Sequence, residues 1–432
     1  MRFATLEEWL AWQESLHPSG MALGLERCRE VLDQLGWGPL PFPVITVAGT
    51  NGKGSTIAFL EAMFIAGGYR VGSYTSPHLL RYNERIRVCG HEVSDDTVMA
   101  GFARIDDARS LTMLTYFEFA TLAAVDIFQH ECVDVALMEV GLGGDLDAVN
   151  LFDPDVAVVT SVDIDHTRWL GTDREAIARH KAGIFRNGRP AVISDPTPPR
   201  ALAQVGGEVG AKVMALGEDF TIQCQARHWE WHGPGRSVMA LPYPRMFGAF
   251  QTANAAGAIM AAHCLSHRFD AQVGQPLALS DDAIVVAMDT AQLRGRFEQI
   301  AGEPAWVLDV AHNPHAARGL SRSLVLSPCY GKTHAVVAML DDKDHLGTLE
   351  PMMPNVDHWY VAGLAGLRGL EAPALARILR TVVAQPCINE FATVEAAVKS
   401  ALANADADDR IVVFGSFHTV REALPQTMRT AI

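Results

Sequence analysis

The chain has 432 residues, of which 49% are hydrophobic and 20% are charged, so it can form two or three domains with packed cores, and intrinsic disorder is excluded. Its formal net charge is −15, and no run of Lys or Arg exceeds a pair, which argues against a nucleic-acid partner. An acidic protein of this kind must bind anions through a local device, such as a helix N-terminus, a lysine or a metal ion.

The sequence also lacks the signals of a secreted or membrane protein. Its seven cysteines are scattered and never spaced as CxxC, which indicates reduced thiols rather than disulfides or a zinc site. The N-terminal segment MRFATLEEWL has acidic residues where a signal peptide needs an apolar run. The longest apolar stretch, Ala253–Leu265, is too short to span a bilayer. We therefore expect a cytoplasmic protein with no membrane partner, and separately we expect a monomer.

In the first half of the chain, short β-branched runs alternate with helical patterns. The strands predicted there are Val44–Ala48, Arg70–Tyr74, Val133–Val140 and Asp155–Val162. Helices are predicted for Ser55–Ala66 and Tyr116–His130. Because this alternation is typical of βαβ units, it predicts an α/β fold with an open, mostly parallel sheet covered by helices on both faces.

The second half changes character twice. Residues 195–250 contain many Gly, Pro and Trp with little periodicity, which predicts a β-rich excursion. A helical pattern returns in FQTANAAGAIMAAHCL, and a second alternating series follows. Its predicted strands are Trp306–Val310, Thr333–Leu340, His358–Ala362 and Arg410–Phe414. We place a domain boundary near residue 290, which gives domains of residues 1–290 and 291–432.

The segment VAGTNGKGST, residues 47–56, resembles a phosphate-binding loop but departs from the standard G-x-x-x-x-G-K-[ST] pattern. Only two residues separate Gly49 from Gly52, and Gly54 separates Lys53 from Ser55. The loop still joins a predicted strand to a predicted helix, where backbone N–H groups, the helix dipole and Lys53 can hold an anion. The alternative is a tight turn with a surface lysine. We favour a nucleotide site, in which the usual magnesium ligand is displaced by Gly54.

Polar residues follow the other predicted strands of the first half. Ser76 follows the second strand, Glu139 ends the third, and Asp165 and His166 follow the fourth. Because ligands gather at the carboxyl ends of parallel strands, these side chains can supply a Mg²⁺ site with phosphate oxygens and water. Each also has a structural alternative: a turn residue for Ser76, a satisfied buried acid for Glu139, and a neighbour of a helix cap for His166.

Lys181 lies in the segment REAIARHKAGIF, on a predicted helical face that it shares with Ile177, Ile184 and Phe185. A lysine on an apolar stripe can extend its ammonium to water. Alternatively, it is desolvated, which lowers its pKa and makes the amine nucleophilic enough to be modified. The sequence leaves both interpretations open.

Two segments of the second half carry further candidates. VLDVAHNPHAA places Asp309, His312 and Asn313 at a strand-to-helix turn, where Asn313 could simply start the helix. Arg296, in the segment GRF, lies near the predicted domain junction and could reach a bound phosphate or ribose.

Taken together, these motifs resemble the folylpolyglutamate synthase/dihydrofolate synthase family, a branch of the Mur ligase superfamily. They occur in family order from about residue 23 to residue 420, and the family's own phosphate loop reads G-T-N-G-K-G-[ST]. The matching segments are LGLERC, VAGTNGKGST, YTSPHLLRYNERIRV, LTYFEF, EVGLGGDLDAVN, TSVDIDHTRWLG, HKAGIF, QTANAA, LRGRFE, LDVAHNPHAA, MLDDKD and GSFHTV.

The resemblance implies an N-terminal ATPase domain of the P-loop kind, a smaller Rossmann-like C-terminal α/β domain, and ATP with one or two Mg²⁺ ions. The residues implied for ATP binding are Gly49, Thr50, Asn51, Gly52, Lys53, Gly54, Ser55, Asn254, Arg296 and Asp309. Those implied for metal binding are Ser76, Glu139 and His166, and those implied for the reaction are Lys53, Lys181 as a carbamate, and His312.

The resemblance also implies three segments that bind dihydropteroate. Their residues are Ala22, Leu23, Gly24, Leu25, Thr115, Tyr116, Phe117, Glu118, Leu146, Asp147 and Ala148. Phe117 could stack on a flat ring, and Asp147 could accept hydrogen bonds from pterin donors. The alternative is that Phe117 starts a buried helix and LGLER braces a loop.

The sequence departs from the family pattern at two positions. Asp145 stands where arginine is usual, which adds negative charge beside an anion site, and Asn83 stands where threonine is common. The first departure puts the geometry of the GGDLDAVN loop in doubt, although it touches none of the implied ligands.

The implied reaction joins the amine of L-glutamate to the carboxylate of dihydropteroate or of a reduced folate. ATP first converts the carboxylate to an acyl phosphate, which the amine then attacks. One alternative is a ligase of the same superfamily that acts on a UDP-linked peptide. The segments LGLER and LTYFE argue against it because they resemble the pterin-binding segments of folate enzymes. Another is a regulatory P-loop NTPase, which would hydrolyse ATP without glutamate, and a non-enzymatic binding module is the least favoured.

Overall fold

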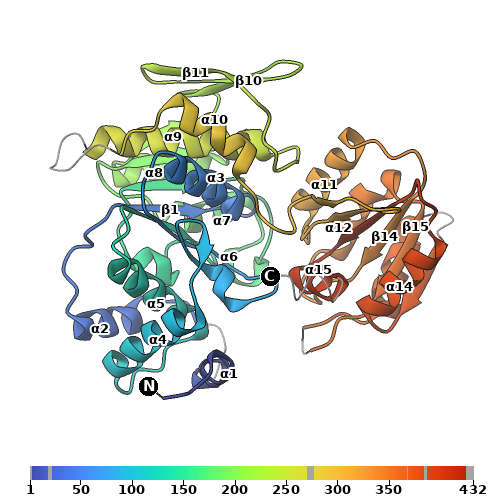
Figure 1. Ribbon diagram of the computed structural model, residues 1–432, viewed down its shortest axis with the longest axis horizontal. Coiled ribbons are helices and arrows are strands. Elements are labelled where there is room, and N and C mark those ends of the chain that lie inside the picture. Colours follow the sequence, from blue (N-terminus) through green and yellow to red (C-terminus); the bar gives the residue numbers. More distant parts are fainter. Residues whose placement is uncertain (1, 18–21, 270–276, 367, 384–386, 425–432) are drawn as a thin grey trace. The chain divides into compact units, whose positions relative to one another are not determined.

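The computed structural model describes residues 2–17, 22–269, 277–366, 368–383 and 387–424, which form two compact units (Figure 1). Unit 1 comprises residues 1–162, 170–245 and 252–291. Unit 2 comprises residues 163–169, 246–251 and 292–432. The sequence predicted an uninterrupted domain up to residue 290, whereas two short segments from that part of the chain belong to unit 2.

Unit 1 is built on an eight-stranded sheet with the order β4-β3-β2-β5-β1-β6-β7-β8. Neighbouring strands from β2 to β8 run parallel, and β3 and β4 extend the sheet as antiparallel strands. The strands are β1 (Val44–Ala48), β2 (Val71–Tyr74), β3 (Ile86–Val88), β4 (His91–Glu92), β5 (Val135–Glu139), β6 (Val156–Val159), β7 (Pro190–Ile193) and β8 (Lys212–Ala215). The mostly parallel α/β sheet predicted from the sequence is thereby confirmed.

Helices lie on both faces of this sheet, with α3, α9 and α10 on one side and α4 and α5 on the other (Figure 1). The helices of unit 1 are α1 (Leu6–Leu16), α2 (Glu26–Leu35), α3 (Lys53–Ala66), α4 (Asp95–Arg109), α5 (Tyr116–His130), α7 (Arg174–Ala182), α8 (Arg200–Val209), α9 (Gln251–Phe269) and α10 (Asp281–Thr290). Within the described part of the chain, no helix, α9 included, is long and apolar enough to cross a membrane.

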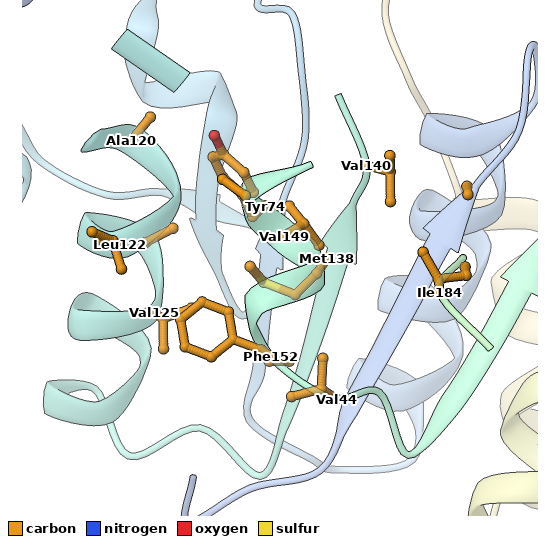
Figure 2. Close-up of a cluster of buried hydrophobic side chains, with 14 of the residues drawn as sticks. Val44, Tyr74, Ala120, Leu122, Val125, Met138, Val140, Val149, Phe152 and Ile184 are labelled. Atoms are coloured by element: carbon orange, nitrogen blue, oxygen red, sulfur yellow. The ribbon is translucent and has the colours of Figure 1, made fainter. Parts of the chain in front are cut away.

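The core beneath β1 and β5 fixes the strand ends that carry the candidate site. Side chains of one face of the sheet, including Val44 and Met138, belong to a buried cluster with Val125 of α5 and with Phe152. Figure 2 shows Val125 beside the ring of Phe152, with Val44 of β1 close by. Because every residue of β1 and β5 is buried, substitutions there would disturb the loops at their carboxyl ends.

The β-rich prediction for residues 195–250 is wrong in part, because this region contains helix α8. Its two adjacent glycines, Gly206 and Gly207, weaken the helical pattern in the sequence. Gly206 is required there because a Cβ at this position would collide with Val213 of β8. After β8, a separate antiparallel sheet contains β9 (Thr221–Cys224), β10 (Trp229–Gly233) and β11 (Arg236–Leu241), as the sequence suggested.

Unit 2 contains a six-stranded sheet with the order β12-β13-β17-β14-β15-β16, in which β12 is antiparallel and the others are parallel. Its strands are β12 (Glu298–Ile300), β13 (Ala305–Leu308), β14 (Thr333–Val337), β15 (His358–Ala362), β16 (Cys387–Phe391) and β17 (Arg410–Phe414). Its helices are α6 (Thr167–Leu170), α11 (Pro314–Leu326), α12 (His345–Leu349), α13 (Ala372–Val382), α14 (Val394–Asn404) and α15 (Phe417–Ala423). The two edge strands β12 and β16 were not predicted.

Candidate functional site

The loop between β1 and α3 requires glycine at two positions. Gly49 has a φ of +152°, and a Cβ there would collide with Thr160 at the end of β6. Gly52 has a φ of +93°, and a Cβ there would lie 2.5 Å from Oδ1 of Asn254. Both backbone conformations are strained for other residues, and the space beside each glycine is filled. The spacing that departs from the standard pattern is therefore dictated by this local packing.

The same loop is fastened to the carboxyl end of the neighbouring strand β6. The N–H of Thr50 donates to the carbonyl of Ser161 at 2.7 Å. The carbonyl of Asn51 accepts hydrogen bonds from the hydroxyls of Thr160 at 2.7 Å and Ser161 at 3.0 Å. Gly52 caps α3 and has no side chain that could accept from the N–H groups of the first turn. A rigid loop with such a helix N-terminus is suited to binding a phosphate.

Lys53 folds back over this loop. Its Nζ donates to the carbonyls of Gly49 at 3.1 Å and Thr50 at 3.3 Å. These contacts hold the ammonium group at the loop. The alternative of a surface lysine would require the ammonium to extend into solvent. The positive charge therefore lies beside the N-terminus of α3, where it can add to the attraction for an anion.

Two of the three implied metal ligands meet at the edge of the sheet. The N–H of Ser76 donates to Oε2 of Glu139 at 3.1 Å, and Glu139 is 4% exposed at the end of β5. Glu139 pairs in register with Val47, directly before the phosphate loop. Among the described residues, no three His, Cys, Asp or Glu side chains are arranged to hold a metal ion. A divalent ion bound by Glu139 and the Ser76 hydroxyl would therefore also draw on phosphate oxygens and water.

His166, the third implied ligand, belongs to unit 2, so its approach to Glu139 stays a prediction. It has a φ of +51°, which is uncommon for a residue with a side chain, and its N–H donates to Oδ1 of Asp165 at 2.7 Å. This hydrogen bond stabilises the sharp turn directly before α6.

Lys181 lies near the end of α7 and is only 4% exposed. Ile177, Ile184 and Phe185, which were predicted to share its face, are all buried. A lysine that extended its ammonium to water would be more exposed, so the structure favours the desolvated alternative.

The three segments implied for the acceptor come together although they are far apart in the sequence. The N–H of Gly24 donates to the carbonyl of Leu146 at 3.1 Å. Arg27 pairs with Glu118 of α5, with Nη2 at 2.7 Å from Oε1. Thr115 caps α5 in a reciprocal capping box with Glu118. The segments therefore line one region of unit 1.

Phe117 and Asp147, the two residues expected to recognise a pterin, differ in their surroundings. Phe117 is half-buried. Its ring packs against Gly141, where an added Cβ would lie only 2.7 Å from the ring. Asp147 is 3% exposed and accepts hydrogen bonds from the N–H groups of Leu142 at 2.8 Å and Val149 at 3.0 Å. Burial outweighs these bonds and raises the pKa of Asp147 to about 7.

In unit 2, Asp309 braces two turns. Its carboxylate accepts hydrogen bonds from the N–H groups of Phe297 and Ala311, each at 2.8 Å. Desolvation raises the pKa of Asp309, against the opposing charge of Arg296. The Arg296 guanidinium lies 5.2 Å from the ring centre of Phe417. Asp309 thus holds the turn that carries Arg296 against the start of the AHNP segment.

Asp165 is the centre of a polar cluster within unit 2. Its carboxylate accepts from Nζ of Lys343 at 2.7 Å and from Nδ2 of Asn313 at 3.0 Å, and it lies 3.4 Å from Nε2 of His312. Desolvation acts against ionisation, but the His312 hydrogen bond and the charges of His166, His312 and Lys343 hold the pKa of Asp165 well below its usual range.

Lys343, in the MLDDKD segment, was not predicted as a site residue. A lysine between acidic residues is usually a solvated charge, and its partner lies 178 positions away in the chain. Asn313 does cap α11, as its structural alternative proposed, by accepting from the N–H of Ala316 at 2.9 Å. Its amide also donates to Asp165, so it has both roles.

Comparisons with known families and sequences agree with this geometry. The sequence matches the family described as Mur ligase middle domain over residues 47–262 and the one described as Mur ligase, glutamate ligase domain over residues 295–417. The dihydrofolate synthase/folylpolyglutamate synthase of Escherichia coli (strain K12) is 42% identical over 420 residues, which cover 97% of this chain and 94% of that protein.

Solved structures are similar to nearly the whole chain. One, "E.coli FolC in complex with DHPP and ADP", has a TM-score of 0.89 at 42% identity and covers 97% of this chain and 96% of its own. Another is a bifunctional folylpolyglutamate synthase/dihydrofolate synthase with Mn, AMPPNP and L-glutamate bound. Its TM-score is 0.86 at 43% identity, with 97% of both chains covered.

Proposed function

The chain belongs to the dihydrofolate synthase/folylpolyglutamate synthase family of Mur ligases, and from this premise we propose a role for each part of its site. The protein is an ATP-dependent ligase that joins L-glutamate to dihydropteroate and to reduced folates. It uses ATP and a divalent metal ion, for which we propose Mg²⁺, in one or two sites.

One observation carries the assignment of the reaction centre to unit 1. The phosphate loop, Lys53 and the Ser76–Glu139 contact gather at the carboxyl ends of the adjacent strands β1, β2 and β5. A nucleotide whose phosphates rest on the N-terminus of α3 would have its γ-phosphate beside this carboxylate. The geometry therefore supports phosphoryl transfer at this edge of the sheet.

The acceptor carboxylate is a poor electrophile, so an oxygen of the carboxylate attacks the γ-phosphorus and ADP leaves, which forms an acyl phosphate. The glutamate amine then attacks the acyl carbon, and inorganic phosphate leaves after the amine loses a proton. Lys53 and the loop N–H groups bind and orient the phosphates, and little covalent work falls to side chains. A metal ion bound near Ser76, Glu139 and His166 would neutralise charge on the phosphate oxygens.

Lys181 is proposed to carry a carbamate, formed when its neutral amine adds to CO₂ and loses a proton. The modification would convert a buried cation into an anion, which can orient a second metal ion. The burial of Lys181 supports this proposal because a lysine that extended its ammonium to water would be more exposed.

Residues outside the loop are proposed to complete the nucleotide site. For Asn254, the proposal is supported by the position of its side chain, which lies against Gly52 within unit 1. Arg296 and Asp309 of unit 2 are proposed to contact ATP, and His312 is proposed to lie near the reacting carboxylate. The contacts of Asp309 with backbone N–H groups suit a residue that also fixes the position of Arg296.

The pterin end of the acceptor is proposed to bind among residues 22–25, 115–118 and 146–148. Phe117 would offer a stacking face, and Asp147 would accept hydrogen bonds from ring donors. Phe117→Ala should then impair the use of dihydropteroate more than the extension of reduced folates.

An assay of the purified protein tests this function. With ATP, Mg²⁺ and L-glutamate, either acceptor should give a glutamylated product and one ADP per amide bond, and omitting glutamate or acceptor should stop steady ATP consumption. Hydrolysis at an equal rate without glutamate would instead support the alternative of a regulatory NTPase. Product from reduced folates but not from dihydropteroate would restrict the enzyme to polyglutamate synthesis. We also propose that the protein is a cytoplasmic monomer. Sedimentation of the purified protein can test its oligomeric state.

A further inference from the structure

Arg27 joins two of the segments proposed to bind the acceptor, although it belongs to neither. Its Nε lies 3.1 Å and 3.2 Å from the two carboxylate oxygens of Glu118, and its Nη2 lies 2.7 Å from Oε1. The same Nη2 donates to the carbonyl of Ala22 at 3.2 Å. One guanidinium group therefore binds the Ala22–Leu25 loop on one side and helix α5 on the other.

Glu118, the partner of Arg27 on helix α5, is itself held in place by further contacts. Its side chain is 3% exposed, and Oε2 accepts from the N–H of Thr115 at 2.7 Å, which closes the capping box of α5. A buried carboxylate needs a charged partner because its desolvation is costly. Glu118 thus fixes Arg27 to the start of α5, and Arg27 fixes the loop.

The third acceptor segment is attached to the same loop by a backbone contact. Gly24 donates to the carbonyl of Leu146, which directly precedes Asp147. The loop therefore bridges between the N-terminus of α5 and the Asp147 turn, and a change in its position would alter the space between Phe117 and Asp147.

We propose that Arg27 is a positioning residue that makes this enzyme able to use dihydropteroate. This inference rests on the proposed function, in which the three segments bind the pterin. Dihydropteroate lacks a glutamyl chain and has only a methylene–amino linker between its pterin and its benzoate ring, so a shift of its pterin end displaces its carboxylate from the γ-phosphate. A reduced folate reaches the same point through a flexible glutamyl chain, which can absorb the shift. Arg27 should therefore matter for the first acceptor and little for the second.

Arg27→Lys is the sharpest variant because it keeps the positive charge. A lysine ammonium can approach Glu118, but it cannot contact both carboxylate oxygens and the Ala22 carbonyl with the fixed geometry of a guanidinium. We expect the KM for dihydropteroate to rise about tenfold or more, while the KM for ATP and the KM and kcat for a reduced folate change less than about twofold.

Arg104→Lys provides a matched control. Arg104 pairs with the buried carboxylate of Asp126, at 2.7 Å, and this pair joins α4 to α5 farther along the same helix. A general loss of stability should appear in both variants, as seen in thermal unfolding. The selective rise in the KM for dihydropteroate should appear only in Arg27→Lys.

If Arg27→Lys does not fold, Arg27→Gln is the second variant, because its amide can still donate a hydrogen bond to the Glu118 carboxylate, and it should show the same selective defect. An equal rise in KM for both acceptors, or no rise for dihydropteroate in a folded variant, would overturn the positioning role. Failure of the parent protein to use dihydropteroate at all would instead refute the proposed function, before any variant is compared.

Discussion

The carboxylate of Asp145 lies 3.0 Å and 3.1 Å from Nδ1 of His180, the residue directly before Lys181. The N–H of Asp145 also donates to the carbonyl of His180 at 3.0 Å. A Cβ on Gly144 would approach the carbonyl of Lys181 within 2.9 Å, and one on Gly183 would collide with Asp145. The GGDLDAVN loop and the end of α7 therefore form one closely packed piece, in which His180 compensates the unusual acid.

We predict that Asp145→Arg will reduce activity even though it introduces the residue that is usual in the family. An arginine opposite His180 loses the attraction across a partly exposed pair, which is worth about 0.2–1 kcal/mol. The KM for the acceptor should rise up to about fivefold, and His180→Glu in the same chain should restore it. Steady-state kinetics of the two single variants and the double variant measure this coupling, and additive effects would show that the pair does not position the loop.

We predict that Lys53→Ala will abolish turnover without unfolding the protein. The side chain donates to two loop carbonyls, so its removal should leave the melting temperature nearly unchanged. Lys399→Ala, which removes a lysine from an exposed ion pair in α14, is the control. Full activity in the Lys53 variant would refute the assignment of the phosphate loop.

Local sequence signals were sufficient for the parts of the fold that local chemistry determines. The predicted bounds of β1 and α5 agree with the structure, and α5 begins at a capping box that Thr115 and Glu118 form within one helical turn. The edge strands β12 and β16 carry weaker patterns because an edge strand has fewer neighbours to bury it.

Contacts between distant residues could not be predicted in the same way. The cluster of Lys343 and His312 around Asp165 depends on residues 163–169 packing with unit 2, which no periodicity indicates. The LGLER segment gives no sign that Arg27 pairs with Glu118, which lies 91 positions away in a segment expected to bind the acceptor. From the sequence, LGLER could either brace a loop or bind a pterin. The contacts of Arg27 are compatible with both roles.

We expect Glu139→Gln to weaken metal activation severely. The substitution replaces a charged oxygen ligand with a neutral amide but preserves an acceptor for the N–H of Ser76. The measurement is the rate as a function of Mg²⁺ concentration, repeated with Mn²⁺. If the titration curve of the variant overlays that of the parent, Glu139 has a structural role and the metal is held elsewhere.

For Lys181 we expect loss of activity in Lys181→Ala and partial recovery when a small carboxylate such as acetate is added. The added anion would take the place of the proposed carbamate in the space that the truncated side chain leaves. Arg179→Ala, two residues earlier in α7, is a control because its guanidinium contacts Gln204 in an exposed position. Recovery of the control variant by acetate, or none for Lys181→Ala, would argue against a carbamate.

We predict that Asp147 makes both the stability of the protein and the binding of the acceptor depend on pH. Its pKa is raised from the ordinary value of 3.8 to about 7 in the folded protein, chiefly by burial. The folded state therefore binds this proton more tightly than the unfolded chain does. The resulting contribution to stability is complete below about pH 4 and is lost as the pH rises through about 7. Asp147→Asn should flatten the pH dependence of the free energy of unfolding across this window.

The corresponding prediction for catalysis has the opposite sign. An ionised Asp147 can accept hydrogen bonds at both of its carboxylate oxygens, whereas the protonated acid offers fewer acceptors to the donors of a pterin ring. With a pKa of about 7, the ionised fraction rises about tenfold from pH 6 to pH 8, so the KM for dihydropteroate should fall by up to that factor. The KM for ATP, measured in the same buffers, controls for general effects of pH. Asp147→Asn should bind dihydropteroate weakly at every pH in this range, and a KM that still falls tenfold in this variant would assign the titration to another group.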